Sequence, residues 1–440
     1  MKKILLIGVG LVSKPLINYL LNSPNIFLTA IDKNISNAES LFQNYSNGKL
    51  SKLDFALQKD EFENLVKEND LVVSLLPAPF HPKVAKLCLK YKKHLVTCSY
   101  VSDEMRAFDE EAKKLGLLFL NEVGLDPGID HMSAMRIIRK VQDDGGKIVD
   151  FYSFCGGIPA PEASMNLLRY KFSWSPRGVV TAAMNDGIYL LEGNKRVVPN
   201  ENLFAKTRLI DVPHFGFLES YVNRDCFPYI EKYNIQGVQN LYRGTLRYLG
   251  WCATWNAFRE LDLVENSEEI DCTNLTKIDY LSQITGIRKD KLEEYLPKIL
   301  GLADTSDVMK RLEWLGFLSE EKIGIDKGDK VGILTSILEG KLKYEEGERD
   351  MTILYHKFLV EYESHKEEIT STLLDYGNPN DLKSMAKLVG LPAGVAARCI
   401  VEGKIEAKGV RIPVTPEIYN PILEELENRN VKFIEESRRV

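Results

Sequence analysis

Residues 4–13 read ILLIGVGLVS, and this stretch decides the fold that the sequence predicts. The unbroken apolar run 4–7 is typical of a strand that is buried on both faces. Gly8 and Gly10 follow it and leave backbone N–H groups accessible to a phosphate at the start of a helix. Ser13 stands where the glycine fingerprint of dinucleotide-binding proteins has Gly or Ala, and its small side chain suits that place. The stretch therefore predicts a strand, a glycine turn and a helix.

Short apolar runs and helix-like stretches alternate through the first 120 residues. The further apolar runs are 27–31, 71–76, 95–98 and 117–120. Segments with apolar residues at three- and four-residue spacing lie between them, and Pro82 suits the first turn of one such helix. This alternation predicts an α/β fold with a Rossmann-type, doubly wound parallel sheet.

Asp32 closes the second apolar run, 22 positions after Gly10. A carboxylate there accepts hydrogen bonds from the ribose hydroxyls and repels a 2′-phosphate, which favours NAD over NADP. Lys33, directly beside it, is a cation that suits a phosphate, so NADP stays possible. The alternative is a glycine turn in an α/β sheet that binds no nucleotide.

The composition bounds the class of protein. The chain has 440 residues and a mass of 50.0 kDa, enough for two or three domains. Its net charge of −6 gives no overall footprint for binding nucleic acid or a membrane surface. Seven cysteines without a CxxC pair indicate reduced thiols in a cytoplasmic protein, and we find no apolar stretch of about 18 residues for a membrane span. The six histidines and the cysteines lack metal-ligand spacing, so we expect no metal site.

The character of the sequence changes after residue 130. Glycine- and proline-rich, aromatic sequence continues to about 251, and 260–345 is helical and charged. In this helical part, one predicted helix face carries Leu292, Leu296 and Ile299, and another carries Val308, Leu312 and Leu315. Residues 351–360 predict a strand. The tail ends with a predicted helix, with Thr415 as its N-cap and Pro416 as its first residue.

Several longer motifs identify a family. They are NEVGLDPGIDH at 121–131, CGGIPAP at 155–161, YKFSWSPRG at 170–178 and YRGTLRY at 242–248. With these motifs the chain resembles saccharopine reductase, the glutamate-forming saccharopine dehydrogenase of the α-aminoadipate pathway, from end to end. The resemblance implies a Rossmann domain (1–128 with 388–440), an α/β substrate-binding and dimerisation domain (129–255 with 346–387), a helical insert (256–345) and a homodimer. It also implies oxidation of saccharopine with NAD(P) and water to glutamate and 2-aminoadipate 6-semialdehyde, or the reverse.

Saccharopine has three carboxylates and two amines, so an acidic protein must supply local guanidinium groups for it. Arg224, Arg243 and Arg247 are the candidates. The resemblance adds the other substrate contacts, which are Ser99, Tyr100, Asp126, Gly244, Thr245 and Leu246. Dinucleotide contacts are expected at Gly8, Gly10, Leu11, Val12, Asp32, Lys33, Asp54, Leu75, Leu76, Cys98, Ser99, Leu125, Asp126, Pro127 and Ser175.

The resemblance places proton handling on Tyr100, Asp126 and Cys155. Each has a plainer interpretation, because Asp126 suits a turn before Pro127, Cys155 suits a small buried position and Tyr100 suits a core. His131 titrates in a useful range, but its place after Gly128 favours a structural role at a helix start.

Two other functions remain open at this point. A related reductive-condensation enzyme, such as a carboxynorspermidine dehydrogenase, would need the same cofactor fold but fewer guanidinium groups. A relative that binds NAD without turnover would be expected to lose the arginine cluster, which is intact here.

Overall fold

The computed structural model describes residues 1–265 and 267–440. The chain divides into two compact units. The first unit comprises Met1–Gly146 and Asp381–Phe433, and the second comprises Lys147–Asn380 and Ile434–Val440.

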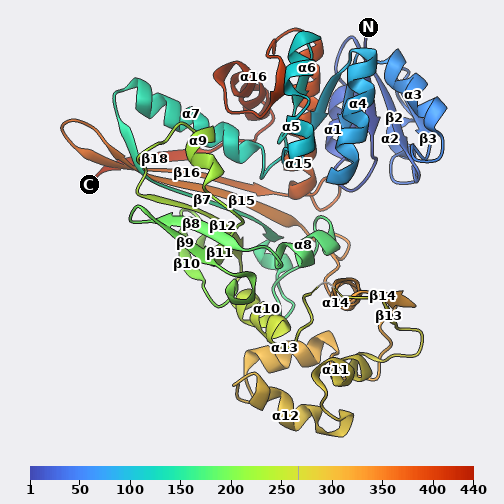
Figure 1. Cartoon of the computed structure of the whole chain (residues 1–440), viewed down its shortest axis with the longest axis vertical. Helices are drawn as coiled ribbons and strands as arrows, with labels where there is room; N and C mark the ends of the chain where they lie inside the picture. The colour runs from blue at the N-terminus through green and yellow to red at the C-terminus, as the bar shows by residue number, and fades with distance from the viewer. Residues whose placement is uncertain (266) are drawn as a thin grey trace. The chain divides into compact units, whose positions relative to one another are not determined.

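The first unit is built on a parallel sheet with the strand order β17-β6-β5-β4-β1-β2-β3. Figure 1 shows strands β2 and β3 of this sheet with the helices around them. Its strands are β1 (Lys2–Ile7), β2 (Ile26–Asp32), β3 (Gly48–Lys52), β4 (Leu71–Ser74), β5 (His94–Thr97), β6 (Leu118–Leu120) and β17 (Gly409–Arg411). Neighbouring strands pair in parallel. The predicted doubly wound sheet and its apolar runs are thus confirmed. The sequence missed both edge strands, because β3 is polar and partly exposed and β17 is only three residues long.

Helices cover both faces of this sheet. The helices of this unit are α1 (Lys14–Leu21), α2 (Glu39–Phe42), α3 (Lys59–Glu68), α4 (His81–Tyr91), α5 (Asp103–Arg106), α6 (Asp109–Lys114), α7 (Ile129–Asp143), α15 (Ser384–Val401) and α16 (Pro416–Glu427), with the 3-10 turn η1 (Ala78–Phe80). Of these, α16 packs against α15 and α7. Leu5, Ile7 and Val72 pack with side chains of α3 and α4 in one apolar cluster. On the other face, α15 packs against α1, β4 and β5. Because both faces are buried, the strands need apolar residues at every position.

Helix α15 corrects one expectation from the sequence. By length and composition alone it is apolar enough to cross a membrane, although we had found no such stretch. Most of it is buried inside the first unit, as in the core helix of a globular domain. A Cβ atom on its Gly390 would lie 2.1 Å from the Val12 carbonyl oxygen, so only glycine permits this close approach of α15 and α1.

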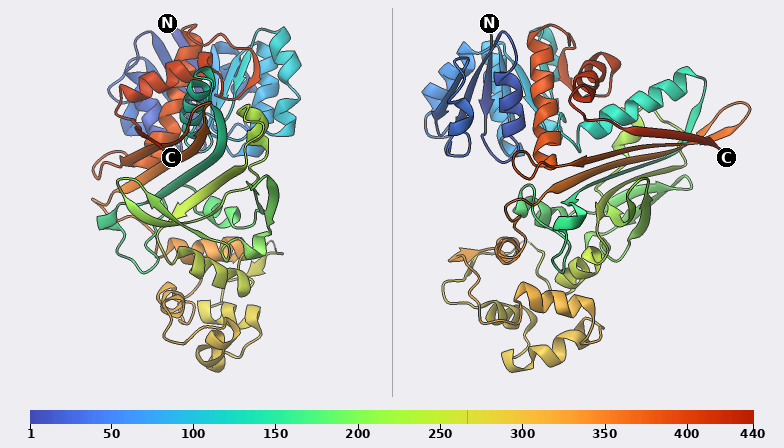
Figure 2. Two further views of the ribbon diagram at one scale, coloured as in Figure 1. Left: turned by 90° about the vertical axis from the view of Figure 1, so that its left-hand side faces the viewer. Right: turned by 180° about the vertical axis from the view of Figure 1, so that it is seen from behind.

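The second unit contains a mixed sheet with the order β10-β11-β12-β7-β15-β16-β18, to which β8 and β9 attach through β12. Its strands are β7 (Lys147–Pro159), β8 (Gly187–Leu191), β9 (Asn194–Val198), β10 (Arg208–Val212), β11 (Gly216–Val222), β12 (Asn240–Arg247), β15 (Asp350–Glu361), β16 (Lys366–Tyr376) and β18 (Ile434–Arg439). Figure 2 shows β15 and β16 as a long hairpin with β18 beside β16. The predicted strand at 351–360 is confirmed as β15.

Helices and a small hairpin complete the second unit. They are α8 (Pro176–Ala182), α9 (Pro228–Lys232), α10 (Trp251–Glu260), α11 (Lys277–Thr285), α12 (Leu292–Ile299), α13 (Asp307–Leu315), α14 (Lys330–Glu339), the hairpin β13 (Ile270–Asp271) with β14 (Lys327–Gly328), and the 3-10 turns η2 (Pro161–Ala163), η3 (Asn200–Asn202) and η4 (Lys289–Lys291). One apolar cluster joins sheet residues to α8, α10 and α11–α14. The predicted face of α13 is buried in it, whereas on α12 Ile299 is 54% exposed and lies outside it.

The C-terminal segment follows the prediction only in part. Helix α16 begins at Pro416 after Thr415, but the Thr415 side chain makes no capping hydrogen bond. The tail does not end with this helix, because β18 follows it; the charged sequence of β18 gave no apolar signal. The predicted three-domain bounds stay a prediction. The compact units differ from them by placing α7 in the first unit, and β18 and residues 256–265 and 267–345 in the second.

Candidate active site

The glycine turn lies between β1 and α1, where the strand order of the first sheet reverses. Gly8 has φ +97°, and a Cβ atom there would lie 3.1 Å from the carbonyl carbon and oxygen of Leu75. A Cβ atom on Gly10 would meet only open space, so this side of the turn is accessible. Ligands of doubly wound sheets bind at this reversal point, beyond the carboxyl ends of the strands. The turn therefore fits a dinucleotide diphosphate.

Asp32 ends β2 beside the turn. Its Oδ2 accepts a hydrogen bond of 2.7 Å from the Val9 backbone N–H, and its Oδ1 accepts one of 3.0 Å from the Asn34 N–H. These bonds fix the carboxylate at the carboxyl end of the strand. Lys33 is exposed next to it and has no ion pair among the residues described.

A hollow opens beside these residues at the ends of β1, β2 and β3. It is lined by Ile7, Gly8, Ile31, Asp32, Lys33, Leu53, Asp54, Phe55 and Leu76. The structure thus brings five predicted dinucleotide residues around one hollow, and Leu75 adjoins it. The sequence missed Leu53 and Phe55, because they follow β3, the strand that gave no apolar signal. Leu11 is exposed at the glycine turn and Val12 is half-buried.

Beyond β4 and β5, the sequence missed a polar cluster around His81. The His81 ring is 2% exposed, and its Nδ1 lies 2.9 Å from Ser74 Oγ. Its Nε2 lies 2.8 Å from Ser99 Oγ and 3.0 Å from Thr97 Oγ1. Burial lowers the pKa of His81 to about 4, so the ring is neutral near neutral pH. No local pattern could have shown this cluster, since its members are brought together by three separate elements.

The 121–131 motif folds into a tight turn that leads into α7. The peptide bond between Asp126 and Pro127 is cis, and the Gly124 N–H donates to the Pro127 carbonyl oxygen (2.9 Å). The Tyr100 hydroxyl donates to Asp126 Oδ1 (3.1 Å), so two predicted catalytic residues are in contact. Leu125 is buried in this turn.

His131 and Cys98 are held by neighbours in the same region. His131 Nε2 lies 2.7 Å from Glu122 Oε2, and both side chains are buried. Glu122 also accepts the Val101 N–H through Oε1 (3.1 Å), as a structural role for His131 would require. Cys98 donates to the Val123 carbonyl oxygen (3.2 Å), and burial raises the pKa of its thiol to about 12.

All predicted substrate residues of the second unit except Arg224 lie on β12, and Cys155, predicted for proton handling, lies on the neighbouring strand β7. Cys155 on β7 pairs with Thr245 on β12, and both side chains are half-buried. Alternation along β12 places Arg243, Thr245 and Arg247 on one face of the strand. The partner of Cys155 on the other side is Leu354 of β15.

The two arginines of β12 are buried among aromatic rings. Arg243 is 2% exposed, with its guanidinium carbon 4.2 Å from the Tyr229 ring centre. Arg247 is 4% exposed, with its guanidinium carbon 5.0 Å from the Tyr170 ring centre and 5.1 Å from that of Trp251. Such stacking stabilises a buried guanidinium.

The remaining predicted residues of this unit lie apart from that face or on the opposite one. Arg224 is exposed, with φ 55°, and follows β11. Gly244 and Leu246 point to the other face of β12, where a Cβ atom on Gly244 would lie 2.2 Å from Ser220 Oγ. Ser175 caps α8 by accepting the Gly178 N–H (3.1 Å); it belongs to the second unit, unlike the other predicted dinucleotide residues.

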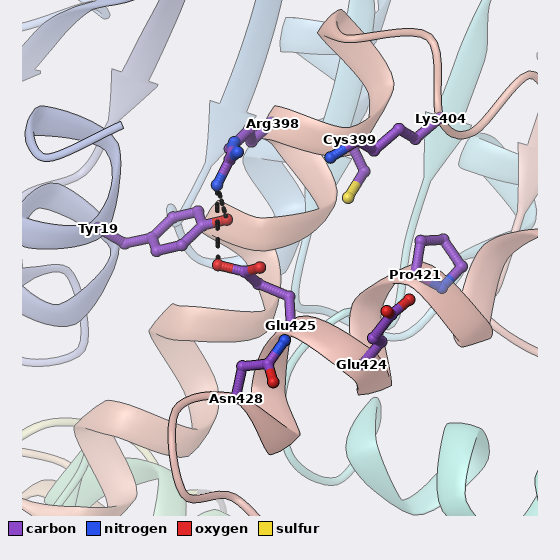
Figure 3. Close-up of a pocket in the computed structure, with 8 residues that line it drawn as sticks. All are labelled: Tyr19, Arg398, Cys399, Lys404, Pro421, Glu424, Glu425 and Asn428. Atoms are coloured by element: carbon purple, nitrogen blue, oxygen red, sulfur yellow. Dashed lines mark hydrogen bonds and ion pairs between the residues drawn. The ribbon is translucent and has the colours of Figure 1, made fainter. Parts of the chain in front are cut away.

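A further pocket of the first unit lies between α1, α15 and α16 (Figure 3). In it, Arg398 donates to the Tyr19 hydroxyl (3.0 Å) and lies 3.7 Å from Glu425. None of the predicted site residues lines this pocket. Across residues 1–265 and 267–440, the structure shows no cluster of three His, Cys, Asp or Glu side chains arranged for a metal ion.

The fold and the turn define a dinucleotide-binding α/β protein of the doubly wound class. The family model described as the saccharopine dehydrogenase NADP binding domain matches residues 4–120, and the one described as the saccharopine dehydrogenase C-terminal domain matches residues 124–431. The chain belongs to the saccharopine dehydrogenase family.

Individual relatives match this chain over almost its full length. A saccharopine dehydrogenase [NADP(+), L-glutamate-forming] of Saccharomyces cerevisiae is 35% identical, over 99% of both chains. A mitochondrial alpha-aminoadipic semialdehyde synthase of Bos taurus is 37% identical over 99% of this chain, which spans about half (48%) of that protein. The solved structure of the apo, histidine-tagged saccharopine dehydrogenase (L-Glu forming) of S. cerevisiae matches with a TM-score of 0.90 and 34% identity, and covers 100% of both chains.

Proposed function

We propose that this protein is a saccharopine dehydrogenase of the L-glutamate-forming type. The observation that carries the proposal is the match to a yeast enzyme of that name over 99% of both chains. The TM-score of 0.90 with a solved enzyme of the same name supports it. No observation favours a carboxynorspermidine dehydrogenase or a relative without turnover.

In the proposed reaction, saccharopine is oxidised at the lysine-derived carbon next to its secondary amine. Held at Gly8, Gly10 and Asp32, NAD(P)+ would supply the acceptor for the hydride that leaves this carbon. Water then hydrolyses the resulting imine to glutamate and 2-aminoadipate 6-semialdehyde, and the reverse direction uses the same groups.

In the first unit, we assign proton handling to Tyr100 and Asp126. Imine hydrolysis requires several proton transfers near neutral pH, and these are promoted by side chains held within hydrogen-bond reach. The Tyr100–Asp126 hydrogen bond orders both groups beyond the end of β5. Ser99, next to Tyr100, is half-buried at the same strand end.

In the second unit, we assign the substrate carboxylates to the guanidinium groups of Arg224, Arg243 and Arg247. Two of these are buried on the face of β12 that carries Thr245, beside Cys155 on β7. A guanidinium that is already out of water loses less hydration when it binds a carboxylate, so the ion pair is stronger there than at the surface.

For the dinucleotide, we propose that Asp32 and Lys33 decide between NAD and NADP. The preference for NAD stays a prediction from Asp32, whereas the yeast relative carries NADP(+) in its name and the matching family model is described as NADP binding. Exposed Lys33 supports the acceptance of a 2′-phosphate.

We also propose a homodimer in the cytoplasm. Both rest on the family resemblance and, for the location, on seven cysteines that are all free thiols in the structure. Sedimentation of the purified protein, and fractionation of cells, would test these two proposals.

The decisive assay mixes the protein with saccharopine and either NAD+ or NADP+ and follows the absorbance band of the reduced nicotinamide. We expect the band to grow, with glutamate formed in equal amount. A protein that gives no signal with either dinucleotide from neutral to alkaline pH would disprove the function.

A further inference from the structure

His81 occupies a place that the chemistry described above does not use. It starts α4, and its ring bridges Ser74, the last residue of β4, to Thr97, the last residue of β5, and to Ser99 beyond it. These strands lie on the side of β1 opposite to β2. Since Asp32 on β2 marks the adenosine side, a dinucleotide crossing the sheet edge brings its nicotinamide half to β4 and β5.

The His81 ring holds buried hydroxyls at two strand ends. Ser74 is fully buried, and in the described part of the chain its hydroxyl has His81 Nδ1 as its only hydrogen-bond partner. Thr97 is 1% exposed, and among the described residues the only acceptor in reach of its hydroxyl proton is His81 Nε2. Loss of the ring would leave both hydroxyls without this partner in a buried place, so the ring is fixed between the strand ends whichever nitrogen carries its proton.

The Nε2 atom lies 2.8 Å from Ser99 Oγ and 3.0 Å from Thr97 Oγ1. Thr97 Oγ1 also accepts the Ser99 backbone N–H (3.2 Å). The Ser99 hydroxyl has no other hydrogen-bond partner among the described residues, so His81 fixes its direction. Ser99 is half-buried, so the hydroxyl keeps a hydrogen-bonding position for a ligand.

We propose that His81 is a positioning residue, which holds the Ser99 hydroxyl in a fixed direction for a hydrogen bond to the nicotinamide half of the dinucleotide. This inference rests on the proposed function for its ligand. Burial of His81 keeps the ring neutral near neutral pH.

The test titrates two amide variants with NADPH and with NADH. Binding is monitored by the fluorescence of the reduced dinucleotide. In His81→Gln the end of the amide group reaches the place of Nε2 and keeps a polar contact with Ser99, whereas in His81→Asn it reaches only the place of Nδ1. We expect His81→Asn to weaken binding of the preferred dinucleotide about fivefold, as for one lost neutral hydrogen bond, and His81→Gln to stay near the wild type.

A double variant separates this role from a merely structural one. If His81 acts through Ser99, Ser99→Ala weakens binding about as much as His81→Asn, and the pair together does no more than either alone. Losses that multiply in the pair, or a His81→Gln variant as weak as His81→Asn, would overturn the inference. Ser74→Ala, which leaves the Ser99 contact in place, should keep wild-type affinity.

The titration uses no saccharopine, so the two proposals fail separately. Wild-type protein that binds NADPH or NADH but does not turn over saccharopine refutes the function and leaves the His81 comparison valid. Wild-type protein that binds neither dinucleotide overturns both.

Discussion

The Asp32 carboxylate has a structural role in the protein and a proposed role in binding the dinucleotide. Its carboxylate holds the glycine turn through the Val9 N–H, and it also faces the place of the adenosine ribose. Asp32→Ala should shift the ratio of kcat/KM values toward NADP by about tenfold, because the charge that opposes a 2′-phosphate is gone. Steady-state rates with both dinucleotides measure this ratio.

Two further variants control that experiment. Asp32→Asn keeps an acceptor for the Val9 N–H and removes only the charge, so it should shift the ratio in the same direction with less loss of total activity. Lys33→Met should shift it toward NAD. An unchanged ratio in Asp32→Asn would show that the carboxylate does not read the ribose.

Arg224 is the exposed member of the proposed carboxylate-binding set. Replacing it with Met should weaken saccharopine binding by roughly 1.5–3 kcal/mol, as for one hydrogen bond to a charged group, with a smaller change in kcat. The KM for saccharopine measures the effect. Arg196 is another exposed arginine of the same unit, and Arg196→Met should leave the KM for saccharopine unchanged. If both variants changed this KM equally, Arg224 would act only as a surface charge and not as a contact of the substrate.

At the residue scale, the site residues that lie close together in the sequence could be predicted. The glycine turn and Asp32 lie in one short segment of strand, turn, helix and second strand, and the structure brings them together. His81, Ser74 and Ser99 come from a helix and two strand ends, so no spacing in the sequence relates them. The burial of Arg243 and Arg247 was likewise hidden, because the rings around them come from several elements.

At the scale of the elements, the close packing of α15 against α1 depends on one glycine. A methyl group on Gly390 would collide with the Val12 carbonyl oxygen at 2.1 Å. Gly390→Ala should lower the free energy of unfolding by about 1–3 kcal/mol and weaken dinucleotide binding, because Val12 belongs to the turn that receives the diphosphate. Denaturant unfolding and a dinucleotide titration measure the two effects.

Gly394→Ala is the matched control on the same helix. Its added Cβ atom would lie no closer than 3.3 Å to Leu16 and Tyr19, whose side chains can adjust. We expect a clearly smaller loss of stability. Similar losses of stability for both variants would show that the collision with the Val12 carbonyl oxygen does not cause the loss in Gly390→Ala.

The strands show why part of the fold escaped prediction. Buried strands of the first sheet carry apolar residues throughout, and each was visible as a short run. The edge strands β3 and β18 are polar, since a solvated edge needs little apolar surface and charges there prevent pairing with other chains. Their place in a sheet comes from distant partners rather than from their own residues.

For the molecule as a whole, acid should weaken the fold through His81. Its pKa is lowered from 6.5 to about 4 in the folded state, so the unfolded chain binds more protons between these pH values. Stability therefore falls as the pH drops from about 6.5 toward 4, by about 3 kcal/mol for this group. Urea unfolding across this range measures the loss, and His81→Gln should show a shallower slope. If the free energy of unfolding changed equally with pH in His81→Gln and in the wild type, the His81 ring would not be held neutral in the folded state.

The first unit is interrupted in the chain by almost all of the second, because its parts are Met1–Gly146 and Asp381–Phe433. During synthesis on the ribosome, α1 therefore cannot pack against α15 until the 362 residues between them have emerged. Meanwhile the apolar side of the nascent sheet that α15 will cover stays open to water and to chaperones. Slow translation before residue 381 would prolong this exposure and favour aggregation of the newborn chain.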